Sequence, residues 1–150
     1  MCAATLFRFG VTPLFAAEAR LEPNRRPEST ELLRLAAARF SNLTNCERAL
    51  LINADVNTKS HQGLAVCGPS SEIDDPSNDP NDAAKWGHQR EIRAELIRWL
   101  CVDPNAIKLI QPDGISVIGA SVVGSLNLDY VHPPFGVRLV RSSIPDLMSL

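Results

Sequence analysis

Hydrophobic positions in the first third of the chain recur at the spacing of an amphipathic helix. In the run 31–40, apolar side chains return every three or four residues after Thr30, a residue type that caps helices. The tetrapeptide that starts at Thr44 matches a capping box, because its hydroxyl can accept a hydrogen bond from the third helical N–H while Glu47 reaches back to the cap N–H. The pattern therefore predicts two helices within an N-terminal helical segment, residues 1–54.

A stronger helical pattern lies further along the chain. Between Gln89 and Val102 one face is apolar, and arginine alternates with glutamate on the other. Asp103 followed by Pro104 is typical of a helix cap and a first helical residue, so one further short helix is expected. A turn at 111–114 then ends the helical pattern. We expect residues 86–113 to form an amphipathic helix and its cap.

The stretch between these helical segments is polar. Residues 55–85 are rich in Gly, Pro, Ser, Asn and Asp, and such a composition buries too little apolar area to offset the entropy of ordering. Alternation of Asp75, Ser77 and Asp79 is similar to a calcium-binding loop, but the glycine and glutamate that such a loop needs are missing. A flexible acidic and polar linker is the expectation.

After Gly114 the helical period gives way to blocks of five residues. Each block has an apolar residue at its centre and a second apolar or small residue two positions earlier. The central residues are Val117, Val122, Leu128, Leu139 and Ile144. In a square β-solenoid these positions point inward, and Gly119 and Gly124 fall where the chain turns a corner. The residues of 131–136 interrupt the blocks as a loop.

This repeat predicts an α+β fold, in which an N-terminal α-helical region is followed by the first coils of a right-handed, pentapeptide-like β-solenoid over residues 114–150. Ordinary antiparallel hairpins can produce a similar alternation, and that alternative stays open. The repeat is imperfect, because one residue is inserted between Val122 and Leu128.

Composition favours a soluble, globular chain of one domain's size. The 150 residues are 45% hydrophobic, and the net charge of -2 offers no positive potential for nucleic acid or for an anionic membrane surface. No run is long and apolar enough to span a membrane. A signal peptide is disfavoured because no basic residue precedes Leu6 and because Arg8 and Pro13 interrupt the apolar start.

The four cysteines are far apart in the sequence. Cys2, Cys46, Cys67 and Cys101 form neither a Cys-x-x-Cys pair nor a tight framework, so neither a zinc site nor a disulfide scaffold is indicated. We therefore expect free thiols and a cytoplasmic location.

No motif for catalysis or for a cofactor stands out. Gly114, Gly119 and Ser121 partly match a phosphate-binding loop, but Ala120 stands where the lysine belongs. The three histidines, His61, His88 and His132, are scattered. We predict no catalytic, cofactor-binding or metal-ligating residue.

One resemblance to a known family can be named. The run Trp86–Leu100, with its Arg93-Ala94-Glu95 helix, and the later Gly-Ala and Gly-Ser-Leu-Asn-Leu steps at 119–120 and 124–128, resemble bacterial pentapeptide-repeat-like proteins. Some members carry the label "membrane-associated oxidoreductase". The resemblance covers about Leu43 to Asp146 and implies a solenoid that continues beyond this length, but it supplies no catalytic residues.

The function expected from these features is that of a non-enzymatic repeat scaffold or protein-interaction module. Either the chain is the front part of a longer solenoid, or a partner completes its exposed end. About one and a half coils bury too little core alone, since repeats need roughly three neighbours to be stable. A protein partner or self-association is expected at the open end, with no nucleic acid and no sequence support for peripheral membrane binding. The alternative, a membrane-associated oxidoreductase, rests on the family label only.

Overall fold

The computed structural model describes residues 29–58, 63–145 and the backbone of 147–149. Cys2 and the apolar start at which a signal peptide was considered lie outside the described residues. Among the helices of the described part, none has both the length and the apolar character that a membrane crossing requires.

The first two helices begin at the caps that the sequence predicts. Helix α1 (Glu31–Arg39) follows Thr30, whose hydroxyl accepts a hydrogen bond from the Leu33 N–H at 3.2 Å. Helix α2 (Asn45–Ala54) starts at Thr44 with both halves of the capping box. There the Thr44 N–H donates to a Glu47 carboxylate oxygen at 3.0 Å, and the Glu47 N–H donates to the Thr44 hydroxyl at 3.1 Å. Both predicted caps are confirmed.

The helix expected from Gln89 starts five residues later. The 3-10 turn η3 (His88–Arg90) and strand β2 (Glu91–Arg93) come first, and α3 (Ala94–Val102) follows. The reason is tertiary, since β2 pairs in parallel with a strand 30 residues further along, opposite Ser121. Helix α4 (Pro104–Leu109) is capped by the Asp103 carboxylate, as predicted.

The stretch 55–85 was expected to be a flexible linker, and its described part holds regular structure. Strand β1 (Ala65–Val66) and the 3-10 turns η1 (Pro76–Asn78) and η2 (Pro80–Lys85) lie within it. The side chain of Arg90 donates to the Ser77 carbonyl at 3.0 Å and to Asn78 Oδ1 at 3.1 Å. Hydrogen bonds to a fixed arginine, which a composition-based argument does not include, hold this polar stretch against the strands.

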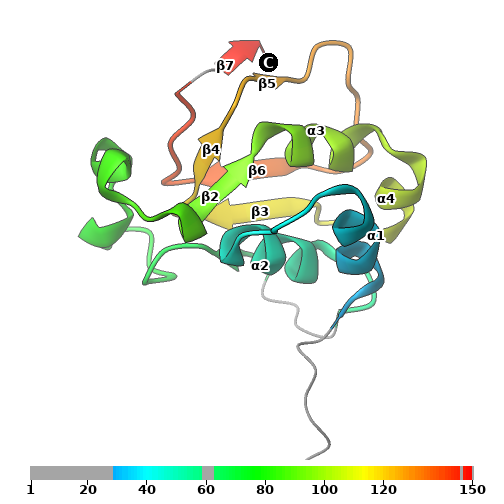
Figure 1. Ribbon diagram of the computed structural model, residues 1–150, viewed down its shortest axis with the longest axis horizontal. Helices are drawn as coiled ribbons and strands as arrows, with labels where there is room; N and C mark the ends of the chain where they lie inside the picture. Colours follow the sequence, from blue (N-terminus) through cyan, green and yellow to red (C-terminus); the bar gives the residue numbers. More distant parts are fainter. Residues whose placement is uncertain (1–28, 59–62, 146, 150) are drawn as a thin grey trace, which may run out of the picture.

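The C-terminal part forms short strands that all pair in parallel (Figure 1). They are β3 (Ile115–Ile118), β4 (Ser121–Val123), β5 (Leu126–Asn127), β6 (Val137–Val140) and β7 (Leu147–Ser149). These strands build one three-stranded sheet, β1-β3-β6, and two two-stranded sheets, β2-β4 and β5-β7. The fold is α+β, and Figure 1 shows α2 and α3 lying against this group of strands, while α1 packs on α2 and α4.

The expected pentapeptide-like β-solenoid is wrong. The described strands form small separate sheets, and two of these sheets take a strand, β1 or β2, from segments that the repeat does not include. Residues paired between β3 and β6, such as Ile115 with Val137, are 137 − 115 = 22 apart, whereas four faces of five residues set an offset of about 20. The hairpin alternative is not seen either, because the named strands pair in parallel. Local alternation identified strands but carried no information about their partners.

The predicted inward positions differ in how far they are buried. Val117 and Val122 are fully buried in the core, but Leu128, Leu139 and Ile144 are only partly buried. The predicted corner glycines lie between strands, with positive φ values of 72° at Gly119 and 87° at Gly124. Such angles favour glycine, because a side chain there is strained.

Candidate functional site: an open strand edge

Residues 137–144, which comprise β6 and the corner after it, are called the outer layer here. It stacks on β3 and β4 through parallel pairing, with Val137 opposite Ile115, Leu139 opposite Val117 and Ser143 opposite Ser121. Beyond it, among the residues that the structure describes, no further strand pairs with β6. The outer layer is therefore the edge of the three-stranded sheet.

Burial drops sharply from the inner strand to this edge. Ile115 and Val117 on β3 are 1% and 0% exposed, whereas their partners Val137 and Leu139 are only partly buried. The other partly buried apolar residues that pack against the core near this layer are Leu128, Phe135 and Ile144. The apolar core therefore reaches the surface at the outer layer.

The backbone of β6 has one bonded side and one open side. The Ile115 N–H donates to the Gly136 carbonyl at 2.9 Å, and the Gly119 N–H donates to the Val140 carbonyl at 3.1 Å. In a parallel ladder alternate residues bond to the same neighbour, so the N–H and C=O groups of Val137 and Leu139 point away from β3. No described residue bonds to those four groups.

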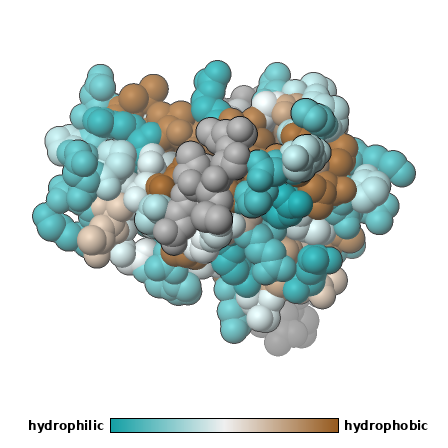
Figure 2. All heavy atoms as spheres, turned by 90° about the horizontal axis from the view of Figure 1, so that it is seen from above, coloured by the Kyte–Doolittle hydropathy of each residue, from teal (hydrophilic) through white to brown (hydrophobic). Residues whose placement is uncertain are grey.

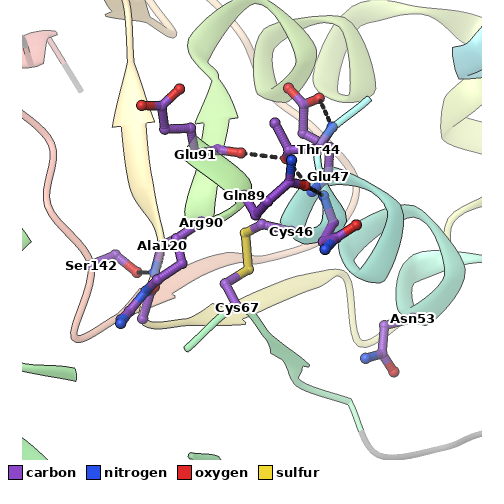
Figure 3. Close-up of a disulfide and its surroundings, with 12 residues drawn as sticks. Thr44, Cys46, Glu47, Asn53, Cys67, Gln89, Arg90, Glu91, Ala120 and Ser142 are labelled. Atoms are coloured by element: carbon purple, nitrogen blue, oxygen red, sulfur yellow. Dashed lines mark hydrogen bonds between the residues drawn. A yellow bond between two sulfur atoms is a disulfide. The ribbon is translucent and has the colours of Figure 1, made fainter. Parts of the chain in front are cut away.

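Hydrogen bonds hold the rest of the outer layer in place. The Val122 N–H donates to the Ser143 carbonyl at 2.8 Å, and the Ser143 N–H donates to the Ala120 carbonyl at 2.9 Å. The Ser142 hydroxyl accepts from the Ala120 N–H (Figure 3) and donates to the Val140 carbonyl. Ser142 therefore ties the corner after β6 to the neighbouring backbone.

Charge on the edge comes from arginine. Arg138 is exposed between the two open residues of β6, and no ion pair joins it to an acidic side chain in the described part of the chain. Arg141 follows the strand and donates through Nε to the Ile73 carbonyl at 2.7 Å. The molecule seen from above carries hydrophobic groups interspersed with hydrophilic ones (Figure 2). The edge thus combines apolar surface, unbonded backbone and positive charge.

A second cluster surrounds Arg90 and supports the corner at Gly119. The Arg90 guanidinium lies over the Trp86 ring at 3.7 Å, and its Nε donates to the Gly119 carbonyl at 2.9 Å. Burial lowers the pKa of Arg90 below its usual range. Its bonds to Ser77 and Asn78 use the other guanidinium nitrogens. Arg90 therefore ties the polar turns to the strand corner and has a structural role.

A third cluster is a buried ion pair between α2 and β2. Glu47, with a fully buried side chain, accepts from Arg93 Nε and Nη2 at 2.8 Å each and from the Arg93 and Thr44 N–H groups at 3.0 Å each. Burial alone raises the pKa of Glu47, but the hydrogen bonds from Arg93 and Thr44 outweigh it and lower the pKa. The carboxylate is fully occupied, so it is not poised to act as a base.

A hollow of about 270 Å³ lies beside this ion pair. His88, which is exposed, contacts the Glu91 carboxylate there through Nδ1, and the Thr44 hydroxyl donates to the Glu91 carbonyl at 2.6 Å. Thr44, Gln89 and Glu91 surround the start of α2 in Figure 3. In the described residues no group of three or more metal-ligating side chains gathers here or elsewhere.

The expectation of free thiols is wrong for two of the cysteines. Cys46 and Cys67 form a disulfide that joins the start of α2 to the end of β1 (Figure 3). Cys101 is free and buried, and burial raises the pKa of its thiol to about 11. Sequence spacing did not reveal the pair, because the fold brings together residues that are 21 positions apart.

The residues considered for chemistry do not converge. His88 pairs with Glu91, His132 is exposed in the loop before β6, and His61 lies outside the described residues. The structure instead places the consecutive residues Val137, Arg138 and Leu139 at the edge of a sheet. The alternation of apolar and charged residues at 137–139 was the available signal, but it does not tell an edge strand from an inner one.

Comparison with known proteins gives no match: no family model, no curated protein and no solved structure is similar to this chain at a significant level. The resemblance described above therefore rests on its quoted motifs alone.

Proposed function

We propose that the protein is a non-enzymatic interaction module that binds another polypeptide at the outer layer. The observation that carries this proposal is the contrast between paired residues, because Val117 is fully buried while Leu139 opposite it is only partly covered. A partner that covers Leu139 and its neighbours removes apolar surface from water, which favours association.

The backbone of β6 gives the same surface a directional component. Strand edges with unbonded N–H and C=O groups are templates on which an extended chain can add a strand. Val137 and Leu139 provide two donors and two acceptors for such a strand. Main-chain bonds supply affinity, and the side chains beside them supply selectivity.

The polar clusters elsewhere favour a binding role over catalysis. The carboxylate of Glu47 and the guanidinium of Arg90 bond to groups within the fold, so neither is available to a substrate. The alternative of a membrane-associated oxidoreductase rests on the resemblance, and no cluster of described residues favours it.

The disulfide is evidence about the compartment in which the protein folds. A cytoplasmic location was expected from free thiols, and Cys46–Cys67 removes that support. Because disulfides form and persist in oxidising compartments, we propose that this protein matures in one. Expression of the chain in a reducing and in an oxidising compartment, followed by counting of alkylated thiols, tests this. Free Cys46 and Cys67 thiols in the folded chain made in the oxidising compartment contradict it.

Amide hydrogen exchange of the isolated protein tests whether the edge is open. The N–H groups of Arg138 and Val140 face β3 in the parallel ladder, so we expect them to exchange slowly. Those of Val137 and Leu139 should exchange much faster. Fast exchange at 137 and 139 alone supports the proposal.

Two other results of the exchange measurement would reject the proposed binding edge or identify a second copy as its partner. Slow exchange at Val137 and Leu139 that does not depend on protein concentration means that another part of the same chain covers the edge, and the proposal then fails. Protection that appears only as concentration rises, together with a doubled mass by light scattering, means that a second copy is the partner.

A further inference from the structure

We infer that the partner at the outer layer is an extended acidic segment of another protein, which pairs with β6 and places a carboxylate opposite Arg138. This inference rests on the proposed function and adds the chemistry of the partner. Three features of β6 support it: the unbonded backbone groups, the separation of apolar and charged side chains on its two faces, and the positive charge of Arg138.

The backbone fixes where such a segment bonds. Only Val137 and Leu139 of β6 direct their N–H and C=O groups away from β3, so a bound strand must bond at these two positions. Arg138 lies between them, and its own backbone groups bond to β3. The added strand therefore runs directly past Arg138.

The side chains fix what the segment must carry. Val137 and Leu139 pack against the core, while Arg138 is exposed on the other face of the strand. Residues opposite each other on paired strands lie on the same face and interact. A fitting partner has apolar side chains on the core side and an acidic one on the solvent side. Alternating valine and glutamate satisfies both.

The charge pattern argues against a second copy as the occupant. Two identical β6 strands pair antiparallel about a two-fold axis, and the register that uses Val137 and Leu139 of both copies sets Arg138 opposite its own counterpart. Like charges directly opposite are destabilising, and charged residues on edge strands commonly block edge-to-edge association. The arginine that disfavours self-pairing favours an acidic strand.

Three synthetic peptides test this on the full-length protein. They are nine residues long, alternate threonine and valine, have blocked ends, and differ only in a central solvent-side residue that is glutamate, glutamine or lysine. Binding is measured by NMR titration of the ¹⁵N-labelled protein. We expect shifts centred on the amides of Val137 and Leu139, and tighter binding of the glutamate peptide than of the glutamine peptide by about 1.5- to 5-fold, with lysine weakest.

A charge reversal supplies the specific control. With Arg138→Glu, which leaves the backbone edge in place, the order of the peptides should reverse so that the lysine peptide binds best. Lys108→Glu on the exposed face of α4 changes the net charge by the same amount and should leave the order unchanged. Added salt should reduce the preference, because Arg138 is exposed.

The outcomes separate this inference from the proposed function. Equal affinity of the glutamate and lysine peptides, with shifts still at Val137 and Leu139, overturns the acidic partner and leaves an interaction edge. A concentration-dependent dimer that protects the same two amides also overturns it. Absence of any shift with all three peptides overturns strand addition by an acidic segment, and the exchange rates of the isolated protein then decide whether the edge is open at all.

Discussion

Gly119 occupies the corner between β3 and β4, where two separate constraints act on one residue. Its φ of 72° lies in the left-handed region, and a Cβ there would be 2.5 Å from Asn78 Oδ1 and 2.9 Å from Arg90 Nη2. We expect Gly119→Ala to lower the free energy of unfolding by more than the roughly 1–2 kcal/mol that a left-handed alanine costs. Urea unfolding followed by circular dichroism measures this.

Gly124→Ala is the matched control for that substitution. Its φ of 87° is also positive, but the nearest atom to an added Cβ, that of Ala94, is 3.7 Å away, which is an ordinary contact. This variant should show the backbone cost alone. If both alanine variants lose the same free energy, the close packing of Asn78 and Arg90 around Gly119 has no energetic weight.

The buried pair of Glu47 and Arg93 predicts a dependence of stability on pH. Because the pKa of Glu47 is lowered from its usual value of 4.5, its contribution is fully present above pH 4.5 and is lost as the pH falls through the lower folded value. Arg93→Met leaves a buried carboxylate without its cation, so unfolding at pH 7 should be easier by about 3 kcal/mol. The difference from the native protein should narrow as the pH falls, because the unpaired, buried carboxylate of the variant takes up a proton at a higher pH than native Glu47, whose pKa is lowered.

A double variant distinguishes loss of the pair from loss of packing. Arg93→Met combined with Glu47→Gln leaves no buried charge, so at pH 7 it should be more stable than Arg93→Met alone. Denaturant unfolding between pH 3 and pH 7 gives all three curves. Equal stability of the single and double variants at pH 7 would show that the unpaired Glu47 carboxylate does not destabilise the folded protein.

At the scale of elements, β1 depends on the disulfide that follows it. Strand β1 has two residues, and the Cys67 N–H continues its pairing by donating to the Ile118 carbonyl at 3.0 Å. A cross-link between residues 21 apart stabilises by about 3 kcal/mol through the loop that it closes. We expect the variant with Cys46→Ala and Cys67→Ala to lose about this much and to exchange the amide of residue 67 faster. Urea unfolding and hydrogen exchange measure the two effects.

Reductant provides the control for this prediction. A dithiol should lower the stability of the native protein to nearly that of the double alanine variant and should leave the variant unchanged. The amide of Val122 in β4, which donates to the Ser143 carbonyl and does not pair with β1, should keep its protection. If the reductant does not change the unfolding midpoint of the native protein, the role assigned to the disulfide is contradicted.

Elements that depend on neighbouring residues could be predicted from the sequence. Thr30, Thr44 and Asp103 cap helices because the groups that they bond to lie two or three residues away. Residues 91–93 could not be assigned, because their helical spacing is overridden by pairing with β4, a partner 30 residues away. The disulfide was missed for the same reason. Sequence pattern reports local bonds and leaves out distant partners.

At the scale of the whole molecule, the candidate site also could not be predicted from local sequence pattern. A partner was expected at the open end of a solenoid over residues 114–150. That solenoid is wrong, and the open edge is strand β6 of a three-stranded sheet. Val117 and Leu139 have equivalent positions in the five-residue blocks, yet one is buried and the other is partly covered. Their difference comes from the order of strands in the sheet, with β3 inside and β6 at the edge, and no periodicity encodes that order.

Helices α1 to α4 and strands β1 to β6 contribute to one core, and this predicts a single unfolding transition. Buried residues of α2, α3 and β3, among them Leu50, Leu96 and Val117, belong to one hydrophobic cluster. Val117→Ala in β3 should therefore lower stability by about 2 kcal/mol, and it should do so for probes in the helices as well as in the strands. Trp99, whose ring packs against Phe40 at 5.6 Å, reports on the helices.

The measurement compares Trp99 fluorescence with far-ultraviolet circular dichroism during urea unfolding, in a Trp86→Phe background so that one tryptophan emits. Both midpoints should fall by the same amount in the Val117→Ala variant, because helices that lose β3 also lose the apolar surface on which they pack. Val102→Ala removes the same atoms from a side chain that is 46% exposed at the end of α3, and it should change stability by less than about 0.5 kcal/mol. If the urea midpoint seen by Trp99 fluorescence stays unchanged while the circular dichroism midpoint falls, α1 to α4 fold independently of the strands. The shared core would then be a contact between two folding units and not the source of one cooperative fold.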